Sequence, residues 1–409
     1  GAPSDAAHGG AWGFARVLRL EHAALRTQSA DVGRGCWSDV SAFRMLLAPT
    51  SQAEAALPSG SHAVVARLRA CATASKAHAS LAVGAYAITG GLGGLGLRAA
   101  KVLVDGGVSR VLLASRSGRV VRDGQGLEHS MGGVAAVLAC DSAGTRDVNA
   151  LCSVDVLSGV LHAAGVGDKG LLTEVALQRV QWMYASKAMG AWYAQCAAAS
   201  APLEVRVLFS SVGSGLGNVG QANYAAGNAC LDAHALSWRV RAMAACSLQW
   251  PLVGGAGMGA AAFAAMADRR VAIAGLAGIS LEEYAACLGA QLVASVDVSG
   301  SVQVVHDSDV RGLLQDLADP SQLRFSELVV VQTMHTPTSV CPAAPVGGPA
   351  GGSILTHSLV GLSTSQRRAH VEASVLRVVR ELTGAPAASL TTETPLMEAG
   401  VDSLAATEL

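Results

Sequence analysis

The chain has only five tyrosines among 409 residues, and one of them follows a glycine-rich stretch with other polar side chains nearby in sequence. In SSVGSGLGNVGQANYAAGN, Ser211 precedes Tyr224, and Asn228 follows one helical turn later. Lys187 lies in the preceding helical segment, SKAMGAWYAQC. A phenol can donate a proton in catalysis, and a nearby ammonium lowers its pKa from about 10 towards the working pH. These four side chains form a candidate proton-donating site.

A second glycine-rich stretch indicates a dinucleotide, which can carry a hydride. AYAITGGLGGLGLRAAKVLVDGG has the pattern strand, glycine turn, helix. Glycines let the backbone approach a pyrophosphate, and the helix N-terminus attracts its charge. An ordinary tight turn is the alternative, but the position in the first βαβ unit favours a dinucleotide site. The predicted cofactor-binding residues here are Thr89, Gly90, Gly91, Leu92, Gly93, Gly94, Leu95 and Gly96.

The end of the next predicted strand indicates which dinucleotide binds. VLLASRSG places Ser115, Arg116 and Ser117 where NAD-binding folds usually carry an acid for the ribose hydroxyl. A guanidinium suits a 2′-phosphate, which a carboxylate would repel. A solvated surface arginine is the alternative. We expect the cofactor to be NADPH.

Two further strand ends should contribute to the same cofactor site. Asp141 follows the predicted strand VAAVLAC, where it can meet an adenine edge. The backbone of the turn after the next strand should line the cofactor, and this turn consists of His162, Ala163, Ala164 and Gly165.

From residue 84, short β-type runs alternate with alanine-rich helical runs. The predicted strands are AYAIT, RVLLAS, VAAVLAC, GVLHAAG, VRVLFSS and ACSLQW. This alternation predicts an α/β fold with a doubly wound parallel sheet of the Rossmann type. Ligands bind at the carboxyl ends of such strands, and the loop that leads to Tyr224 leaves the end of VRVLFSS.

Composition excludes several other classes of protein. Hydrophobic residues make up 51%, but much of this is alanine, and no long apolar run is free of charge and glycine, so no membrane insertion is expected. The formal net charge is −1, with both signs dispersed, which gives no basis for nucleic-acid binding. Nine scattered cysteines without zinc-type spacing predict no metal site and favour buried free thiols in a reducing, cytoplasmic setting.

Several of these runs together resemble a known family. TGGLGGLG, LLASRSG, HAAGV, SKAMGAW, SSVGSGLGNVGQANYAAGNACLDA and, more loosely, LQWPLVGGAGM resemble the ketoreductase domain of a modular type I polyketide synthase, a relative of the short-chain dehydrogenases/reductases. Ordinary members of that superfamily place the lysine four residues after the tyrosine, where this chain has Asn228. The spacing of Lys187 and Tyr224 is similar to that of the polyketide synthase ketoreductases.

The resemblance implies an NADPH-dependent reduction of the β-keto group of a carrier-bound acyl thioester. Tyr224 would be the proton donor, and Lys187 would lower its pKa and bond the nicotinamide ribose. Ser211 would hydrogen-bond the substrate carbonyl, and Asn228 would position Lys187 or a water. Residues 259–290 lie where relatives carry a lid helix, although their apolar side chains are equally typical of a core.

The configuration of the product alcohol stays open at this stage. Many members of the family read Leu-Asp-Asp after HAAGV, where this chain has Gly167, Asp168 and Lys169. The alternative marker is a tryptophan three residues before the tyrosine, and that place holds Gln221.

The two ends of the chain extend the resemblance beyond the reductase. Residues 1–80 resemble the C-terminal part of the structural subdomain that precedes such ketoreductases, and 81–334 would be the catalytic domain. A Pro/Gly-rich linker is expected over 335–356, followed by the N-terminal part of an acyl-carrier domain over 357–409. In such domains, 4′-phosphopantetheine attaches to the serine of a DSL motif, here Ser403. We expect the chain to be a piece of a longer polypeptide, with this carrier as its partner.

Two alternatives remain beside a carrier-dependent reductase. One is a free-standing reductase of small ketones, against which the DSL motif and the N-terminal segment argue. The other is a ketoreductase-like scaffold or epimerising unit that no longer reduces, which the loss of the tyrosine, the lysine or the glycine turn would have supported.

Overall fold

The computed structural model describes residues 8–33, 52–57, 64–70, 81, 83–120, 126–154, 156–255, 278–293, 302–304, 313–314, 322–329, 363–383 and 391. The chain divides into two compact units, Gly1–Met334 and His335–Leu409. The first contains the predicted reductase residues and is described first.

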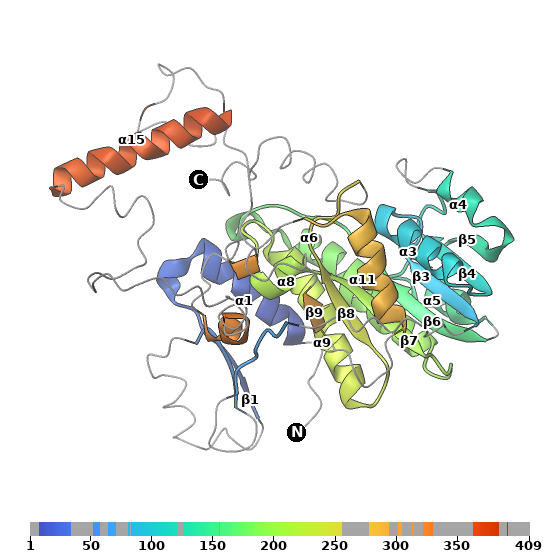
Figure 1. The fold of residues 1–409 in the computed structure, drawn as a ribbon. Coiled ribbons are helices and arrows are strands. Elements are labelled where there is room, and N and C mark those ends of the chain that lie inside the picture. The colour runs from blue at the N-terminus through green and yellow to red at the C-terminus, as the bar shows by residue number, and fades with distance from the viewer. Residues whose placement is uncertain are drawn as a thin grey trace, which may run out of the picture. The chain divides into compact units, whose positions relative to one another are not determined.

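A parallel sheet of seven strands forms the centre of the first unit, with the order β5-β4-β3-β6-β7-β8-β9 (Figure 1). The sequence order reverses between β3 and β6, which is the position where doubly wound sheets bind dinucleotides. The predicted Rossmann-type fold is confirmed, and three predicted strands have the predicted bounds, β3, β4 and β7. The strands are β3 (Ala85–Thr89), β4 (Arg110–Ser115), β5 (Ala135–Ala139), β6 (Leu157–His162), β7 (Val205–Ser211), β8 (Cys246–Trp250) and β9 (Val302–Val304).

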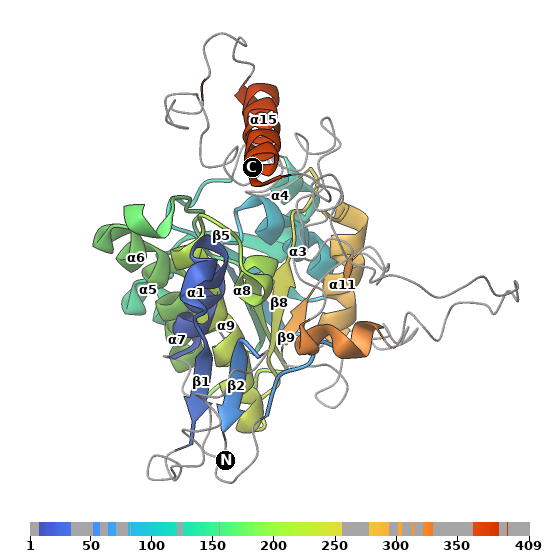
Figure 2. The ribbon, with the colours of Figure 1, turned by 90° about the vertical axis from the view of Figure 1, so that its left-hand side faces the viewer.

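Helices cover both faces of this sheet. Figure 2 shows α3 (Gly94–Asp105) and α11 (Leu281–Val293) on one side. On the other side lie α5 (Thr145–Cys152), α6 (Leu177–Tyr184), α7 (Gly190–Ala197) and α9 (Ala222–Val240). The short helices α4 (Leu127–Ser130) and α8 (Val212–Leu216) follow β4 and β7.

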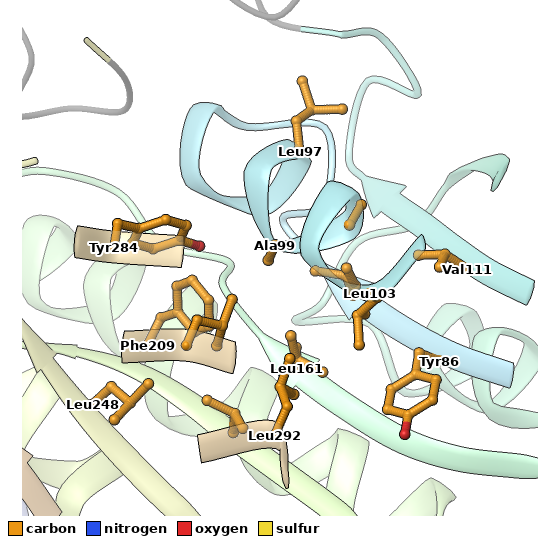
Figure 3. Packing of buried hydrophobic residues seen from close by; sticks show 14 of the residues in the cluster. Tyr86, Leu97, Ala99, Leu103, Val111, Leu161, Phe209, Leu248, Tyr284 and Leu292 are labelled. Carbon is orange, nitrogen blue, oxygen red and sulfur yellow. The ribbon is translucent and has the colours of Figure 1, made fainter. Parts of the chain in front are cut away.

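Alternation along the strands produces the two cores. On β3, Tyr86 and Ile88 face α3 and α11, whereas Ala85 and Ala87 face α5 and α7. Bulky side chains fill the first core (Figure 3), and an aromatic group joins α11 to the sheet there. The ring centroids of Trp250 and Tyr284 lie 4.6 Å apart. The central strands β3, β6, β7 and β8 are therefore buried on both faces, as is usual in parallel sheets.

The N-terminal segment packs against the second layer of helices. Helix α1 (Gly9–Glu21) runs beside α9, and β1 (Ser29–Val32) pairs in parallel with β2 (Glu54–Leu57) (Figure 2). The two helices approach so closely that a Cβ added at Gly13 would lie 2.3 Å from the backbone oxygen of Ala225. Helix α1 is thus seated directly on the helix that carries Tyr224.

Within the described residues, the second unit contributes one long helix, α15 (Thr364–Thr383). Among the helices that could be searched in the described ranges, none combines the length and the apolar character needed to cross a bilayer.

Candidate active site

A widened turn places Lys187 in the interior. Between α6 and α7, residues Ala185–Met189 form a π-helical segment, a feature often found at functional sites. The Lys187 side chain is buried, and its Nζ donates a hydrogen bond to the backbone oxygen of Phe209, at 3.0 Å. The same nitrogen lies 5.8 Å from the ring centroid of Tyr224. A Cβ added at Gly165 would lie 2.8 Å from this nitrogen, so the turn after β6 closes the other side.

Burial also controls the charge of this lysine. Loss of solvent lowers the pKa of Lys187 to about 8, and the negative charge of Asp232 opposes the shift. Lys187 therefore remains mainly an ammonium at neutral pH.

Tyr224 lies in the first turn of α9 and is partly buried. Desolvation raises its pKa, while hydrogen bonds with the side chains of Ser211 and Asn228 act in the opposite direction. Desolvation outweighs these two hydrogen bonds, and the effect of Lys187 on this pKa stays a prediction. The phenol is consequently protonated at neutral pH, as a proton donor must be.

Ser211 and Asn228 complete the group of four predicted side chains. Ser211 ends β7 and caps α8, since its Oγ accepts from the backbone N–H of Gly213 at 3.3 Å. Asn228 is fully buried, and its Nδ2 donates to the backbone oxygen of Tyr224 at 2.9 Å. Its Oδ1 is buried without a hydrogen-bond partner in the described part of the chain. That oxygen can accept a hydrogen bond from a water or a ligand.

Sequence reasoning missed a buried carboxylate behind these residues. Asp232 accepts hydrogen bonds from the hydroxyls of Ser214 and Ser247, at 2.7 and 2.6 Å, and from the amide Nε2 of Gln249, at 2.7 Å. The Ser210 hydroxyl is linked to Ser214 at 3.1 Å. The only sequence signal for this network is an acid among the alanines of α9. Its carboxylate fixes the start of α8 and supplies the charge that opposes the fall in the pKa of Lys187.

The glycine turn after β3 has the shape expected of a dinucleotide cradle. Gly90 has a φ of 69°, and a Cβ there would lie 2.6 Å from the backbone of Ala164. The turns after β3 and β6 therefore touch at the point where the strand order reverses. Helix α3 begins after Gly93 with no side-chain cap, so its positive end is open to a phosphate.

The end of β4 offers groups for the other part of a dinucleotide. The Ser115 hydroxyl is buried without a hydrogen-bond partner among the described atoms, which leaves it available to a ligand. Arg116 and Ser117 are exposed, although the Ser117 Oγ accepts from the N–H of Arg119 at 3.2 Å. Asp141 is also exposed, and one carboxylate oxygen accepts from the N–H of Ala143 at 3.0 Å. The unsatisfied hydroxyl beside an exposed guanidinium fits a phosphorylated ribose.

Two side chains in the predicted cofactor stretches are occupied within the protein. The Thr89 hydroxyl and His162 Nδ1 are 2.7 Å apart, and His162 Nε2 is 3.1 Å from the backbone oxygen of Lys187. Burial lowers the pKa of His162 to about 3, and the charge of Lys187 acts in the same direction. Only the backbone at these two positions is free to line a cofactor, while the side chains tie β3 and β6 to the π-helical segment.

The structure also shows the contacts of residues at the two positions that mark product configuration in the family. Asp168 forms an ion pair with Arg179 and accepts a hydrogen bond from the amide of Asn223, immediately before Tyr224. Gln221 accepts from the Asn218 amide at 2.9 Å, and Lys169 is exposed. The loop after β6 is thereby attached to the start of α9.

Some sequence predictions lie outside the described residues. These include Ser403, the linker 335–356 and residues 256–277 of the expected lid region. The described remainder of that region, in α11, belongs to the core, since Tyr284 and Leu288 are fully buried against the sheet. Where the described residues could be searched, no group of acidic, histidine and cysteine side chains could hold a metal ion.

Comparisons with known sequences find two families along the chain. Residues 84–255 match the KR domain, and residues 373–409 match the phosphopantetheine attachment site. The spectinabilin polyketide synthase system protein NorB of Streptomyces orinoci is 35% identical over 336 residues, which cover 80% of this chain and 15% of that protein. Polyketide synthase GfsA of Streptomyces halstedii is 32% identical over 351 residues, 80% of this chain and 4% of that protein. The chain thus spans a small part of these relatives.

Solved structures give the same picture. An A-type ketoreductase from a modular polyketide synthase aligns with a TM-score of 0.68 at 26% identity, covering 80% of this chain and 70% of that one. The first ketoreductase of the tylosin polyketide synthase aligns with a TM-score of 0.66 at 27% identity, covering 81% and 72%.

Proposed function

This chain belongs, over residues 84–255, to the ketoreductase domains of polyketide synthases, and from that premise we propose that it reduces the β-keto group of an acyl thioester with NADPH. The product would be a β-hydroxyacyl thioester. The substrate would be carried by 4′-phosphopantetheine on Ser403 of the carrier domain in the same chain. The observation that supports this most is the convergence of Tyr224, Ser211 and Lys187 beside the glycine turn.

The chain's own residues account for the proton and the orientation of the substrate. NADPH, when bound, supplies the hydride. The Ser211 hydroxyl donates a hydrogen bond to the ketone oxygen, and Tyr224 transfers its phenolic proton to that oxygen as negative charge develops there. The buried Lys187 ammonium stabilises the phenolate that remains. The free Oδ1 of Asn228 can hold a water through which the phenolate regains a proton.

The residues present fit NADPH better than NADH. Arg116 is an exposed guanidinium directly after the unsatisfied Ser115 hydroxyl, and no carboxylate occupies the end of β4. A guanidinium and a hydroxyl together complement a 2′-phosphate.

The reaction is tested by NADPH consumption with a short β-ketoacyl thioester. Tyr224→Phe removes the proton donor, and we expect the rate to fall about 100-fold or more while NADPH binding is retained. Tyr193→Phe, on α7 and away from the site, is the matched control and should keep the parent rate. Equal rates for Tyr224→Phe and the parent would disprove the assigned acid. A parent that binds NADPH but never oxidises it would instead support a non-reducing scaffold or epimerising unit.

Cofactor choice is tested by titration with NADPH and NADH. Loss of a charged hydrogen bond costs about 1.5–3 kcal/mol, so Arg116→Ala should weaken NADPH binding by about 10- to 100-fold and leave NADH binding unchanged. Arg119→Ala, three positions further along the same exposed loop, is the control. Unchanged NADPH affinity in Arg116→Ala would refute the assignment.

A further inference from the structure

One residue of the N-terminal segment reaches the loops that border the candidate site. Glu21 ends α1, far in sequence from the residues that match the KR domain. Its Oε1 accepts a hydrogen bond from the backbone N–H of Gly220, and its Oε2 accepts one from the backbone N–H of Leu172, each at 2.8 Å. A single carboxylate thus connects the loop before α9 with the loop after β6.

These two loops lead directly to the reacting groups. Gly220 lies four residues before Tyr224, and the other loop begins at Gly165, beside Lys187. The loops also bond each other, because the N–H of Gly170 donates to the backbone oxygen of Gly220 at 2.9 Å. A shift of either loop would therefore change the position of Tyr224 relative to a bound substrate.

The position of Glu21 is itself fixed by the rest of α1. Arg16 donates to both carboxylate oxygens of Glu54, at 2.7 and 2.8 Å, and to the backbone oxygen of Ser214 at 2.5 Å. Leu20 packs so closely on Gly217 that an added Cβ there would lie 2.8 Å from its Cδ1. The helix therefore holds the carboxylate at a constant place beside the loops.

We propose that Glu21 is a positioning residue that clamps the two loops and so sets how the acyl thioester is presented to Tyr224. The inference rests on the proposed function for its kinetic consequence, and on the hydrogen bonds alone for the clamp. Backbone N–H groups bonded to a carboxylate are held more strongly than by a neutral acceptor. A glutamine at this position replaces one of the two acceptor oxygens with an NH2 group, which would face one of the two N–H groups without accepting from it.

The test uses the full chain with Glu21→Gln and Glu21→Ala. Amide hydrogen exchange, followed by mass spectrometry, should be faster in both variants in the peptides that contain Leu172 and Gly220. Exchange in the strands of the sheet should be unchanged. With a short β-ketoacyl thioester, kcat/KM should fall about 10-fold, the equivalent of roughly one charged hydrogen bond, while the Kd for NADPH stays within about twofold. Glu282→Gln, an exposed carboxylate on α11, is the matched control for exchange and rate.

The outcomes separate the clamp from the proposed reaction. Unchanged exchange in both peptides, or unchanged kcat/KM in Glu21→Ala, would overturn the proposal. A parallel loss of NADPH binding and of the unfolding midpoint would show a general structural role and would overturn it as well. A parent chain that oxidises no NADPH would refute the proposed function, and the clamp would then be decided by the exchange measurement.

Discussion

At the scale of single residues, the candidate site combines ionisable groups that burial drives towards their neutral forms. Burial lowers the pKa values of Lys187 and His162 and raises that of Tyr224. For Tyr224 and His162 the neutral form is the useful one, since the first must hold a proton and the second must connect β3 to the π-helical segment. Lys187 is the exception, because its proposed role requires the charge that burial disfavours.

The buried ammonium of Lys187 should cost folding stability. Its pKa is about 8 in the folded chain and 10.5 in the unfolded one, so at pH 7 the cost is about 3 kcal/mol. Lys187→Met removes this cost, so the variant should unfold at the same or a higher denaturant concentration than the parent at pH 7. It should also abolish reduction, because the proposed role of Lys187 needs the ammonium. Above pH 8 the unfolded parent binds more protons than the folded parent, so the parent's stability rises with pH.

The measurement is denaturant unfolding of both proteins at pH 7 and pH 9.5. The advantage of Lys187→Met should shrink by about 2 kcal/mol between these values. Lys101→Met, on the exposed side of α3, is the control and should give no such change. A variant that is less stable than the parent by the same amount at both pH values would contradict the expectation.

His162 should make the fold sensitive to acid. Its pKa is about 3 when folded and about 6.5 when unfolded, so the unfolded chain binds the extra proton between these values and stability falls as the pH falls. This one group should remove about 2 kcal/mol between pH 6.5 and pH 5. His162→Gln cannot titrate and should show a shallower loss in unfolding experiments over that range. Parallel curves for the parent and His162→Gln would exclude this explanation, and His22→Gln, at an exposed position, is the control.

The sequence predicts residues whose type is unusual for their place, and it misses residues that act through distant backbone. Tyr224 and Lys187 could be found because few other side chains can donate or stabilise a proton beside a glycine turn. Glu21 bonds two N–H groups that are remote in sequence, and no local pattern records such a contact. Asp232 could only be suspected, since an acid in a helix is usually solvated.

At the scale of elements, the strands were predictable because they are apolar runs that end in glycine or polar residues. The bounds of β3, β4 and β7 follow these ends. The π-helical segment at Ala185–Met189 was not predictable, because it differs from an α-helix by one hydrogen-bond step and leaves no change in composition. The position of α11 was ambiguous for a similar reason, since an apolar helix suits a lid or a core equally.

Helix α11 packs against α3, the helix that follows the predicted dinucleotide turn. The Tyr284 hydroxyl donates to the backbone oxygen of Leu95, in the first turn of α3, at 2.8 Å. Tyr284→Phe keeps the ring packed on Trp250 and removes only this bond, so it should lower the free energy of unfolding by about 1 kcal/mol. Denaturant unfolding measures this, with Tyr193→Phe as the half-exposed comparison. A variant as stable as the parent would show that the bond contributes nothing to the attachment of α11.

At the scale of the whole chain, the candidate site combines strand ends of the central sheet with the N-terminal helix α1. The sheet brings β3, β4, β6 and β7 to one edge, and the N-terminal helix α1 fixes the loops there. The sheet could be predicted, because alternating strands and helices admit few topologies. The packing of α1 on α9 could not be predicted, because it depends on the close approach of small residues rather than on any motif.

The division of the chain into two units leads to a prediction about proteolysis. The boundary between the units falls at residues 334 and 335, where the Pro- and Gly-rich segment expected to be a linker begins. Segments of this composition seldom form a packed core, so a protease at low concentration should cut first within 335–356. The larger fragment should keep its unfolding midpoint and, if the proposed function holds, its rate with a short β-ketoacyl thioester, because every described site residue precedes the cut.

Mass spectrometry of the fragments, with activity measured over the same time course, provides the test. First cuts within 84–255, or activity lost in step with cleavage at 335–356, would mean that the reductase site depends on the second unit.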